Sequence, residues 1–185
     1  YLRTLLNRIE PYAPIDMDPS TGEPTGGLHE KAIIRVKWDW PVEPNRDQAY
    51  HGAEQILKEC AAVGLTCVYD TVDKSQIRAV LDLKNDGKLP IRVRMDARID
   101  LFQDLLNLGI YRGFGDDWIR LCGLKFFFDG AISARTAAVT EPYLNQPDFY
   151  GVMGTTREVA TQTILAAYEQ GYRISAHGKH HRHTH

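Results

Sequence analysis

The sequence lacks several features that would assign it directly to a class of protein. Its three cysteines, Cys60, Cys67 and Cys122, have no CxxC spacing, which favours reduced thiols in a core over a disulfide framework or a zinc cluster. No apolar run approaches the roughly 20 residues that a membrane helix needs. With 22 basic and 24 acidic residues the net charge is −2, so nothing electrostatic favours nucleic acid or a membrane surface as a partner. We therefore expect an ordinary globular protein with one core.

The two ends of the sequence also lack ordinary features. The first residues, Tyr-Leu-Arg-Thr, contain no initiator methionine and no signal pattern, so we expect an internal piece of a longer protein and a cytoplasmic location. Five of the seven histidines fall within residues 177–185. Residues 179–185 cannot build a core, and we interpret them as a disordered His-rich tail or tag rather than a metal site.

Regular structure is predicted only after an irregular lead-in over residues 1–50. From residue 51 to 178, amphipathic helical patterns alternate with short β-rich runs. Helices are expected over 51–63, 75–85, about 100–108 and from the capping-box pattern Thr155-x-x-Glu158 to Tyr168; strands are expected over 65–69, 89–95, 124–128 and 172–176. This alternation indicates βα units and a parallel sheet.

Two architectures fit this pattern. No glycine-rich phosphate loop follows any strand, so nothing favours a doubly wound nucleotide-binding sheet. A (β/α)₈ barrel needs about 250 residues and eight strands. Four strands would make this chain a partial barrel, and the pattern alone does not choose between the two architectures.

The connection over residues 129–154 is much longer than the 2–6 residues usual for βα loops. It contains Tyr143, Phe149 and Tyr150, which argue against disorder. An ordered long loop after a strand is where a barrel enzyme places its active site.

Two residues near strand ends could carry chemistry. Lys125 stands in an apolar strand, where desolvation would make its amine reactive toward carbonyls or carbon dioxide, although it could also extend to solvent from the other face. His177 follows Ile174-Ser175-Ala176 and is either a ligand or a hydrogen-bonded structural residue. Asp70 and Asp96 also end predicted strands, where we expect them to cap the next helix.

Three segments together resemble the amidohydrolase superfamily, specifically its YtcJ-like branch, which includes N-substituted formamide deformylases. They are residues 21–30 (TGEPTGGLHE), residues 64–70 (GLTCVYD) and residues 124–138 (LKFFFDGAISARTAA), the last followed by Glu141-Pro142-Tyr143. Each segment alone is weak evidence. Their order, continued by Gly151 and His177, covers nearly the whole chain.

The resemblance implies a partial TIM-type barrel, about strands 2–5, of a metal-dependent hydrolase acting on carbon–nitrogen bonds other than peptide bonds. Lys125 would be a carboxylated lysine and His177 a histidine ligand, binding one or two divalent ions, with zinc as the expected metal. Asp129, Arg135 and Tyr143 would line the substrate side. The family's remaining histidine ligands and its catalytic Asp cannot be placed in this sequence, so we expect the fragment alone to be inactive.

Two other functions remain open at this point. Lys125 could be the nucleophile of a Schiff-base lyase that uses no metal, or the barrel could serve a binding or regulatory role without turnover. Under the leading hypothesis the partner is a small amide-type substrate, with neither nucleic acid nor membrane, and the parent protein could be a homo-oligomer.

Overall fold

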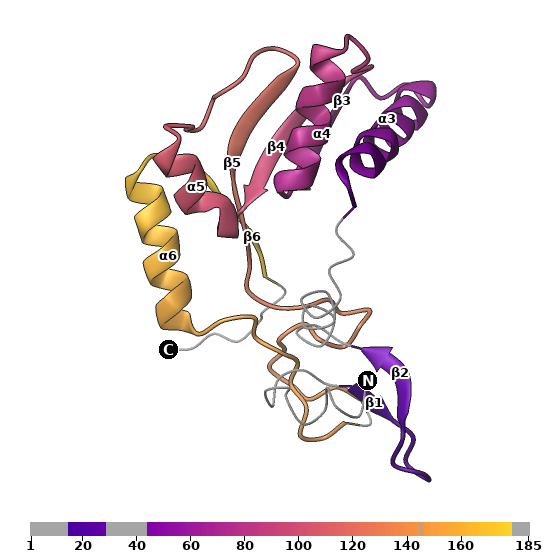
Figure 1. Ribbon diagram of the computed structural model, residues 1–185. Helices are drawn as coiled ribbons and strands as arrows, with labels where there is room; N and C mark the ends of the chain where they lie inside the picture. The colour runs from indigo at the N-terminus through magenta and orange to yellow at the C-terminus, as the bar shows by residue number, and fades with distance from the viewer. Residues whose placement is uncertain (1–14, 29–43, 145, 179–185) are drawn as a thin grey trace. The chain divides into compact units, whose positions relative to one another are not determined.

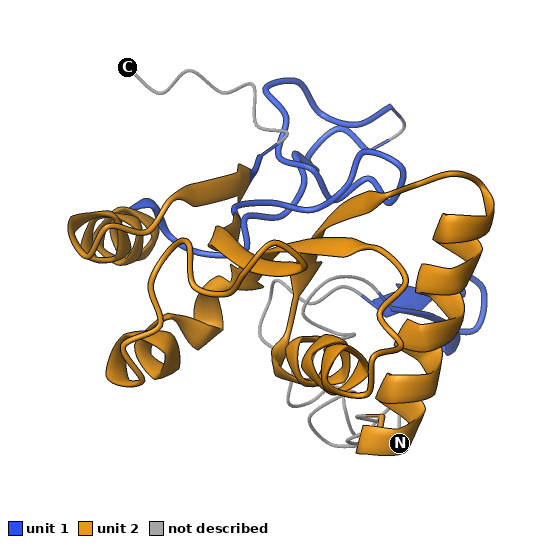
Figure 2. Cartoon of the chain, turned by 90° about the horizontal axis from the view of Figure 1, so that it is seen from above, with its two compact units in different colours: residues 1–42, 127–157, 177–185 blue, residues 43–126, 158–176 orange. Residues whose placement is uncertain are grey.

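The computed structural model describes residues 15–28, 44–144 and 146–178. The chain divides into two compact units (Figure 2). The sheet unit comprises residues 43–126 and 158–176, and the loop unit comprises residues 1–42, 127–157 and 177–185. The predicted His-rich tail, residues 179–185, and much of the predicted lead-in lie outside the described residues.

A four-stranded parallel sheet forms the centre of the sheet unit (Figure 1). Its order is β3 (Cys67–Val72), β4 (Arg92–Arg98), β5 (Ile119–Phe127) and β6 (Ile174–His177). β4 pairs in parallel with both β3 and β5. The amides of Leu124 and Phe128 donate to the carbonyls of Arg173 and His177, so β6 also runs parallel to β5. The predicted α/β class with a parallel sheet is confirmed, and closure into an eight-stranded barrel stays a prediction.

Helices connect the strands, and two of them begin earlier than the hydrophobic pattern predicts. They are α3 (Arg46–Ala62), α4 (Lys74–Asn85), the short 3₁₀ turn η1 (Ile99–Leu101) leading into α5 (Phe102–Asn107), and α6 (Arg157–Glu169). Reciprocal hydrogen bonds between Asn45 and Gln48 start α3 five residues before the predicted position. Asp73 and Gln76 form the same pair of bonds at the start of α4, one residue before the predicted position. Capping side chains therefore set these boundaries, ahead of the first apolar residue of each helix.

The helices cover one face of the sheet through two apolar clusters. The first joins α3 and α4 to β3, β4 and the start of β5, with Leu83 completely buried; its buried members are Leu57, Val72, Val80, Leu83, Leu89, Ile91, Val93, Met95 and Ile119. The second joins α5 and α6 to β4 and β5 through Ala97, Leu105, Leu121, Leu124, Ala167 and Tyr172. Because alternate strand residues point to opposite faces, the other face carries the polar members of each strand.

β5 begins at Ile119, five residues before the predicted start. The register moves from Met95 opposite Leu121 to Asp96 opposite Gly123, which leaves Cys122 as the extra residue of a bulge. The bulge reverses the alternation in the middle of the strand. Because of this reversal and of Arg120 and Gly123, the first half of β5 does not show the regular alternation from which a strand is predicted.

The turn before β5 is held by a carboxylate that responds to pH. The Lys84 amine and the amides of Ile119 and Trp118 hold the pKa of Asp116 at about 2. A carboxyl group with a lowered folded-state pKa stabilises the fold above its unfolded pKa of about 3.9, and this stabilisation is lost as pH falls toward 2. Asp116→Asn should therefore lower the unfolding midpoint at pH 7 and lower it less near pH 2.5. Asp117→Asn, at a side chain that is 97% exposed, is the control and should change neither midpoint.

The loop unit contains a two-stranded antiparallel hairpin, β1 (Ile15–Met17) and β2 (Pro24–Leu28), and the connection after β5. Between residues 129 and 154 the described residues form turns and one antiparallel bridge, Asp129 to Met153. Among the described helices, none combines the length and apolar character that crossing a bilayer requires.

Candidate functional site

Lys125 lies on the polar face of the sheet, as the hydrophobic pattern of its strand suggests. Its neighbour Leu124 is completely buried in the helix-side core, so Lys125 points to the opposite face. The register places it opposite Arg98 of β4. The residue is half-buried, and its charge acts on the carboxylate of Asp96. Lys125 is thus placed in the sheet unit beside a buried anion.

Among the described residues of the sheet unit, Asp96 is the most buried charged side chain, with 1% of its surface exposed. Its carboxylate accepts a hydrogen bond from the Tyr69 hydroxyl at 2.7 Å. Nη2 of Arg173 donates to both carboxylate oxygens, at 3.0 and 3.2 Å. Burial raises the pKa of Asp96 above its usual value, although a hydrogen bond with Ser175 and the charge of Lys125 act in the opposite direction.

The expectation that Asp70 and Asp96 cap helices is wrong. Asp73 is the N-cap of α4, while Asp70 lies within β3 and accepts a hydrogen bond from the amide of Thr71. Asp96 lies inside β4 and is bonded across the sheet. Both strands extend three residues beyond their predicted ends, so these carboxylates lie in the sheet rather than at a capping position.

His177 ends β6 and belongs to the loop unit. Its Nε2 lies 3.0 Å from the carbonyl oxygen of Gly130. Because a carbonyl only accepts, this contact requires a proton on Nε2, which leaves Nδ1 as the ring nitrogen that could bind a metal. Metal-binding histidines characteristically donate their other ring N–H to such a carbonyl. The imidazole therefore fits the role of a ligand to a divalent ion, although the described residues hold no group of three or more His, Cys, Asp or Glu arranged for a metal.

The three predicted substrate-side residues all lie in the loop unit. Asp129 is buried and accepts a hydrogen bond from the amide of Ala138 at 3.0 Å. The Tyr143 hydroxyl donates to the carbonyl of Ala137 at 2.9 Å. Arg135 is exposed, with a backbone φ of 56°, a left-handed conformation that non-glycine residues seldom adopt. Asp129 and Tyr143 thus stabilise the loop through hydrogen bonds to its own backbone, while Arg135 is exposed.

Sequence reasoning missed Tyr69, Gly123, Arg173 and Ser175, which all lie around Asp96. One local signal could have indicated the polar face: β4 alternates apolar Val93, Met95 and Ala97 with charged Arg94, Asp96 and Arg98. Nothing in the sequence pairs Asp96 with Arg173, which is 77 residues away.

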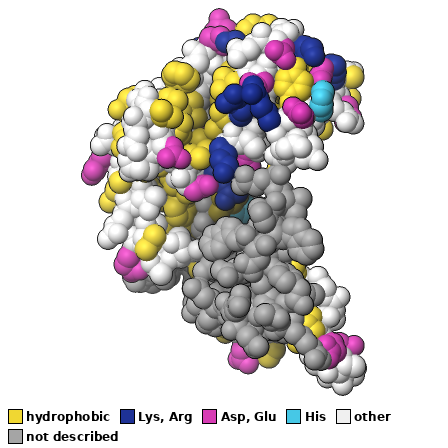
Figure 3. All heavy atoms as spheres, in the orientation of Figure 1, with side chains coloured by type: hydrophobic (Ala, Val, Ile, Leu, Met, Phe, Trp, Pro, Cys, Tyr) yellow, Lys and Arg dark blue, Asp and Glu magenta, His cyan; other side chains and the backbone are white. Residues whose placement is uncertain are grey.

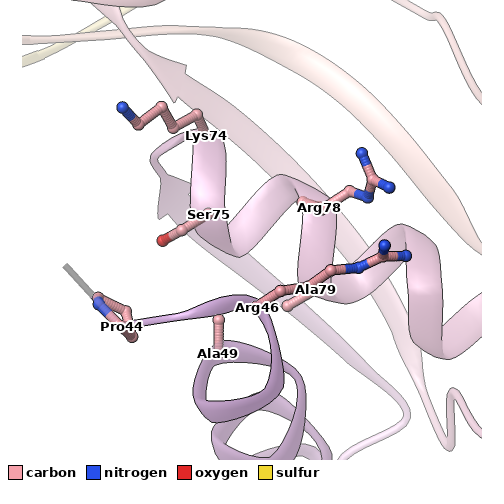
Figure 4. A pocket seen from close by; sticks show the side chains of 7 residues that line it. All are labelled: Pro44, Arg46, Ala49, Lys74, Ser75, Arg78 and Ala79. Carbon is pink, nitrogen blue, oxygen red and sulfur yellow. The ribbon is translucent and has the colours of Figure 1, made fainter.

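A hollow of about 400 Å³ lies on the helix side, between the first turns of α3 and α4 (Figure 4). It is lined by Pro44, Arg46, Ala49, Lys74, Ser75, Arg78 and Ala79, none of which is a predicted site residue. Arg46 and Arg78 are both paired with Asp82, and Lys74 points away from their guanidinium groups. Two of the cations are therefore engaged by Asp82, and the three do not surround one site for an anionic ligand.

Charged side chains of both signs are interspersed over the face of the sheet unit visible in Figure 3. No single-sign patch forms on that face. The candidate chemistry thus rests on Lys125 and its neighbours in the sheet unit and on His177 and the braced loop in the loop unit.

Comparison with known proteins gives concordant matches. The model of a family described as the amidohydrolase family matches residues 10–183. The putative amidohydrolase YtcJ of Bacillus subtilis (strain 168) is 30% identical over 184 residues, which cover 92% of this chain and 33% of that protein. The protein LONG AFTER FAR-RED 3 of Arabidopsis thaliana is 26% identical over 180 residues, 91% of this chain and 31% of that protein. The chain spans about a third of the length of these relatives.

A similar fold occurs in solved structures. An uncharacterized metal-dependent hydrolase from Pyrococcus horikoshii OT3 superimposes with a TM-score of 0.71 at 23% identity, covering 97% of this chain and 36% of that one. A Pyrococcus furiosus protein of the same description gives the same TM-score and identity over 96% of this chain and 37% of its own. The arrangement of strands and helices is therefore shared with part of these larger proteins.

Proposed function

Because this chain belongs to the amidohydrolase family, we propose that it is part of a metal-dependent hydrolase that cleaves carbon–nitrogen bonds other than peptide bonds. N-substituted formamides and related small amides are the proposed substrate class, following the resemblance of residues 124–138 to the formamide deformylase branch. The observation that carries the proposal is the 3.0 Å contact of His177 Nε2 with the Gly130 carbonyl, which leaves Nδ1 as the ring nitrogen that could bind a metal.

Lys125 and His177 are the proposed ligands from this chain, and zinc is the proposed metal. A bound divalent ion would lower the pKa of a water molecule toward 7 and polarise the amide carbonyl. Lys125 would add carbon dioxide, forming a nitrogen–carbon bond and releasing a proton. The resulting anionic carbamate offers two oxygens as ligands. The remaining ligands and the catalytic Asp of the family would come from other parts of the full-length protein.

The loop unit supplies the proposed substrate side. Asp129 and Tyr143 hold the loop through bonds to Ala138 and Ala137, and the exposed Arg135 would contact polar groups of the substrate. A loop held by its own side chains keeps its shape before the substrate binds, which reduces the entropy that binding must overcome.

The test uses the protein expressed from its complete gene. The protein should retain a divalent metal through gel filtration and hydrolyse N-substituted formamides. It should lose this activity after dialysis against a chelator and regain it on addition of zinc. His177→Gln, which can still donate to Gly130 but lacks the ring nitrogen, should lower the metal content. Turnover that survives chelation, together with borohydride trapping of Lys125 on a carbonyl substrate, would instead establish the Schiff-base lyase.

A further inference from the structure

Asp96 connects strands that are not neighbours in the sheet. Its carboxylate, on β4, is bonded to Tyr69 of β3 at 2.7 Å and to Arg173, directly before β6, at 3.0 Å. Ser175 of β6 also acts to lower the pKa of Asp96. All these residues belong to the sheet unit. One buried carboxylate therefore ties β3, β4 and β6 together across the polar face of β5.

Arg173 is held from three directions. Its guanidinium lies over the Tyr69 ring, 5.2 Å from the ring centroid, while Nη2 is bonded to Asp96. Its carbonyl oxygen accepts the amide of Leu124 at 2.8 Å. Gly123 permits this close approach, because a Cβ there would overlap the Arg173 carbonyl. The start of β6 is thus fixed against the segment of β5 that carries Lys125.

Lys125 shares the polar face with this network. It follows Gly123 by two residues, so both lie on the same face, and Gly123 is directly opposite Asp96 in the register. Its charge acts on Asp96. In the register, Asp96 therefore lies diagonal to Lys125 on the same face of the sheet, two residues toward the start of β5.

We propose that Asp96 is a positioning residue for Lys125, holding the lysine and the adjoining start of β6 in the arrangement that metal binding requires. The inference rests on the proposed function of Lys125 as a ligand. Outer partners of metal ligands typically contribute 10–100-fold to metal affinity. Arg173 is 44% exposed, so water can solvate its guanidinium once the Asp96 charge is removed, and no uncompensated charge is left buried. The expected effect of Asp96 therefore falls on the metal rather than on the fold.

The experiment measures zinc affinity by competition with a chromophoric chelator, and the visible spectrum of the cobalt-substituted protein, in the protein expressed from its complete gene. Asp96→Asn keeps the shape of the side chain and removes its charge. It should weaken zinc binding about 10–100-fold and alter the cobalt spectrum, with an unfolding midpoint near that of the wild type. Asp100→Asn is the matched control, because Asp100 also pairs with an arginine, Arg98, but is 64% exposed. The control should leave affinity within about twofold of wild type, as expected for an exposed ion pair.

Parallel measurement of Lys125→Ala separates the two proposals. If Lys125→Ala weakens zinc binding and Asp96→Asn does not, the positioning role is wrong and the proposed function stands. If Lys125→Ala leaves affinity unchanged, the proposed function is wrong and the positioning role is wrong with it. Should Asp96→Asn fail to fold, Tyr69→Phe removes only the hydroxyl bonded to Asp96 and must still weaken binding several-fold. An unchanged affinity in that variant overturns the inference.

Discussion

Lys125→Ala should reduce the hydrolysis of amide substrates at least about 10³-fold in the protein expressed from its complete gene. A metal ligand contributes several kcal/mol of transition-state stabilisation, and roughly 4 kcal/mol corresponds to this factor. The effect should appear in kcat, because the lost interaction acts on the reacting carbonyl and water rather than on the rest of the substrate. Steady-state kinetics, together with the metal content of the purified variant, measures both consequences.

Two comparisons make this result specific. Lys125→Arg keeps the positive charge but cannot form a carbamate, so it should be as inactive as Lys125→Ala. Lys58→Ala removes a lysine that is paired with Glu54 on the surface of α3, and it should retain full activity. Near-normal turnover in Lys125→Ala would show that the lysine is not a metal ligand, even though the chain belongs to the amidohydrolase family.

The sequence predicted the elements of the sheet unit well, for a physical reason. The apolar stripes of α3 and α4 and the apolar runs of β3 to β6 are local patterns, because each element must bury one face against its neighbours. Element boundaries were less predictable. The caps Asn45 and Asp73 start two helices before their apolar stripes, and the bulge at Cys122 interrupts the alternation of β5.

For the candidate site, too, local features could be predicted and long-range contacts could not. Lys125 and His177 could be proposed as site residues because each stands at a recognisable place in a strand whose sequence resembles a known family. The partners of Asp96 were not found, because hydrogen bonds between β3, β4 and β6 depend on strand order and register. A single sequence states neither. For the same reason, the hydrogen bonds inside residues 129–154, between Asp129 and Ala138 and between Tyr143 and Ala137, could not be predicted.

Two glycines provide the strongest test of the structure itself, because alanine should have opposite effects at them. Gly52 lies inside α3, where an added Cβ meets no atom within 4 Å. Gly52→Ala should stabilise the protein by about 0.5–1 kcal/mol, because alanine loses less conformational entropy in a helix. Gly123→Ala puts the same methyl group against the Arg173 carbonyl and 3.1 Å from Oδ1 of Asp96.

Gly123→Ala should lower the free energy of unfolding by roughly 3 kcal/mol, the upper end of the usual range for overpacking. The Arg173 carbonyl cannot move away without weakening its bond to the Leu124 amide, the main-chain link between β5 and the start of β6. The bond from Arg173 to Asp96 would be strained by the same shift. Urea denaturation followed by circular dichroism measures both variants. A Gly123→Ala protein as stable as Gly52→Ala would mean that β6 does not lie against β5 as described, and the positioning role of Asp96 would lose its structural basis.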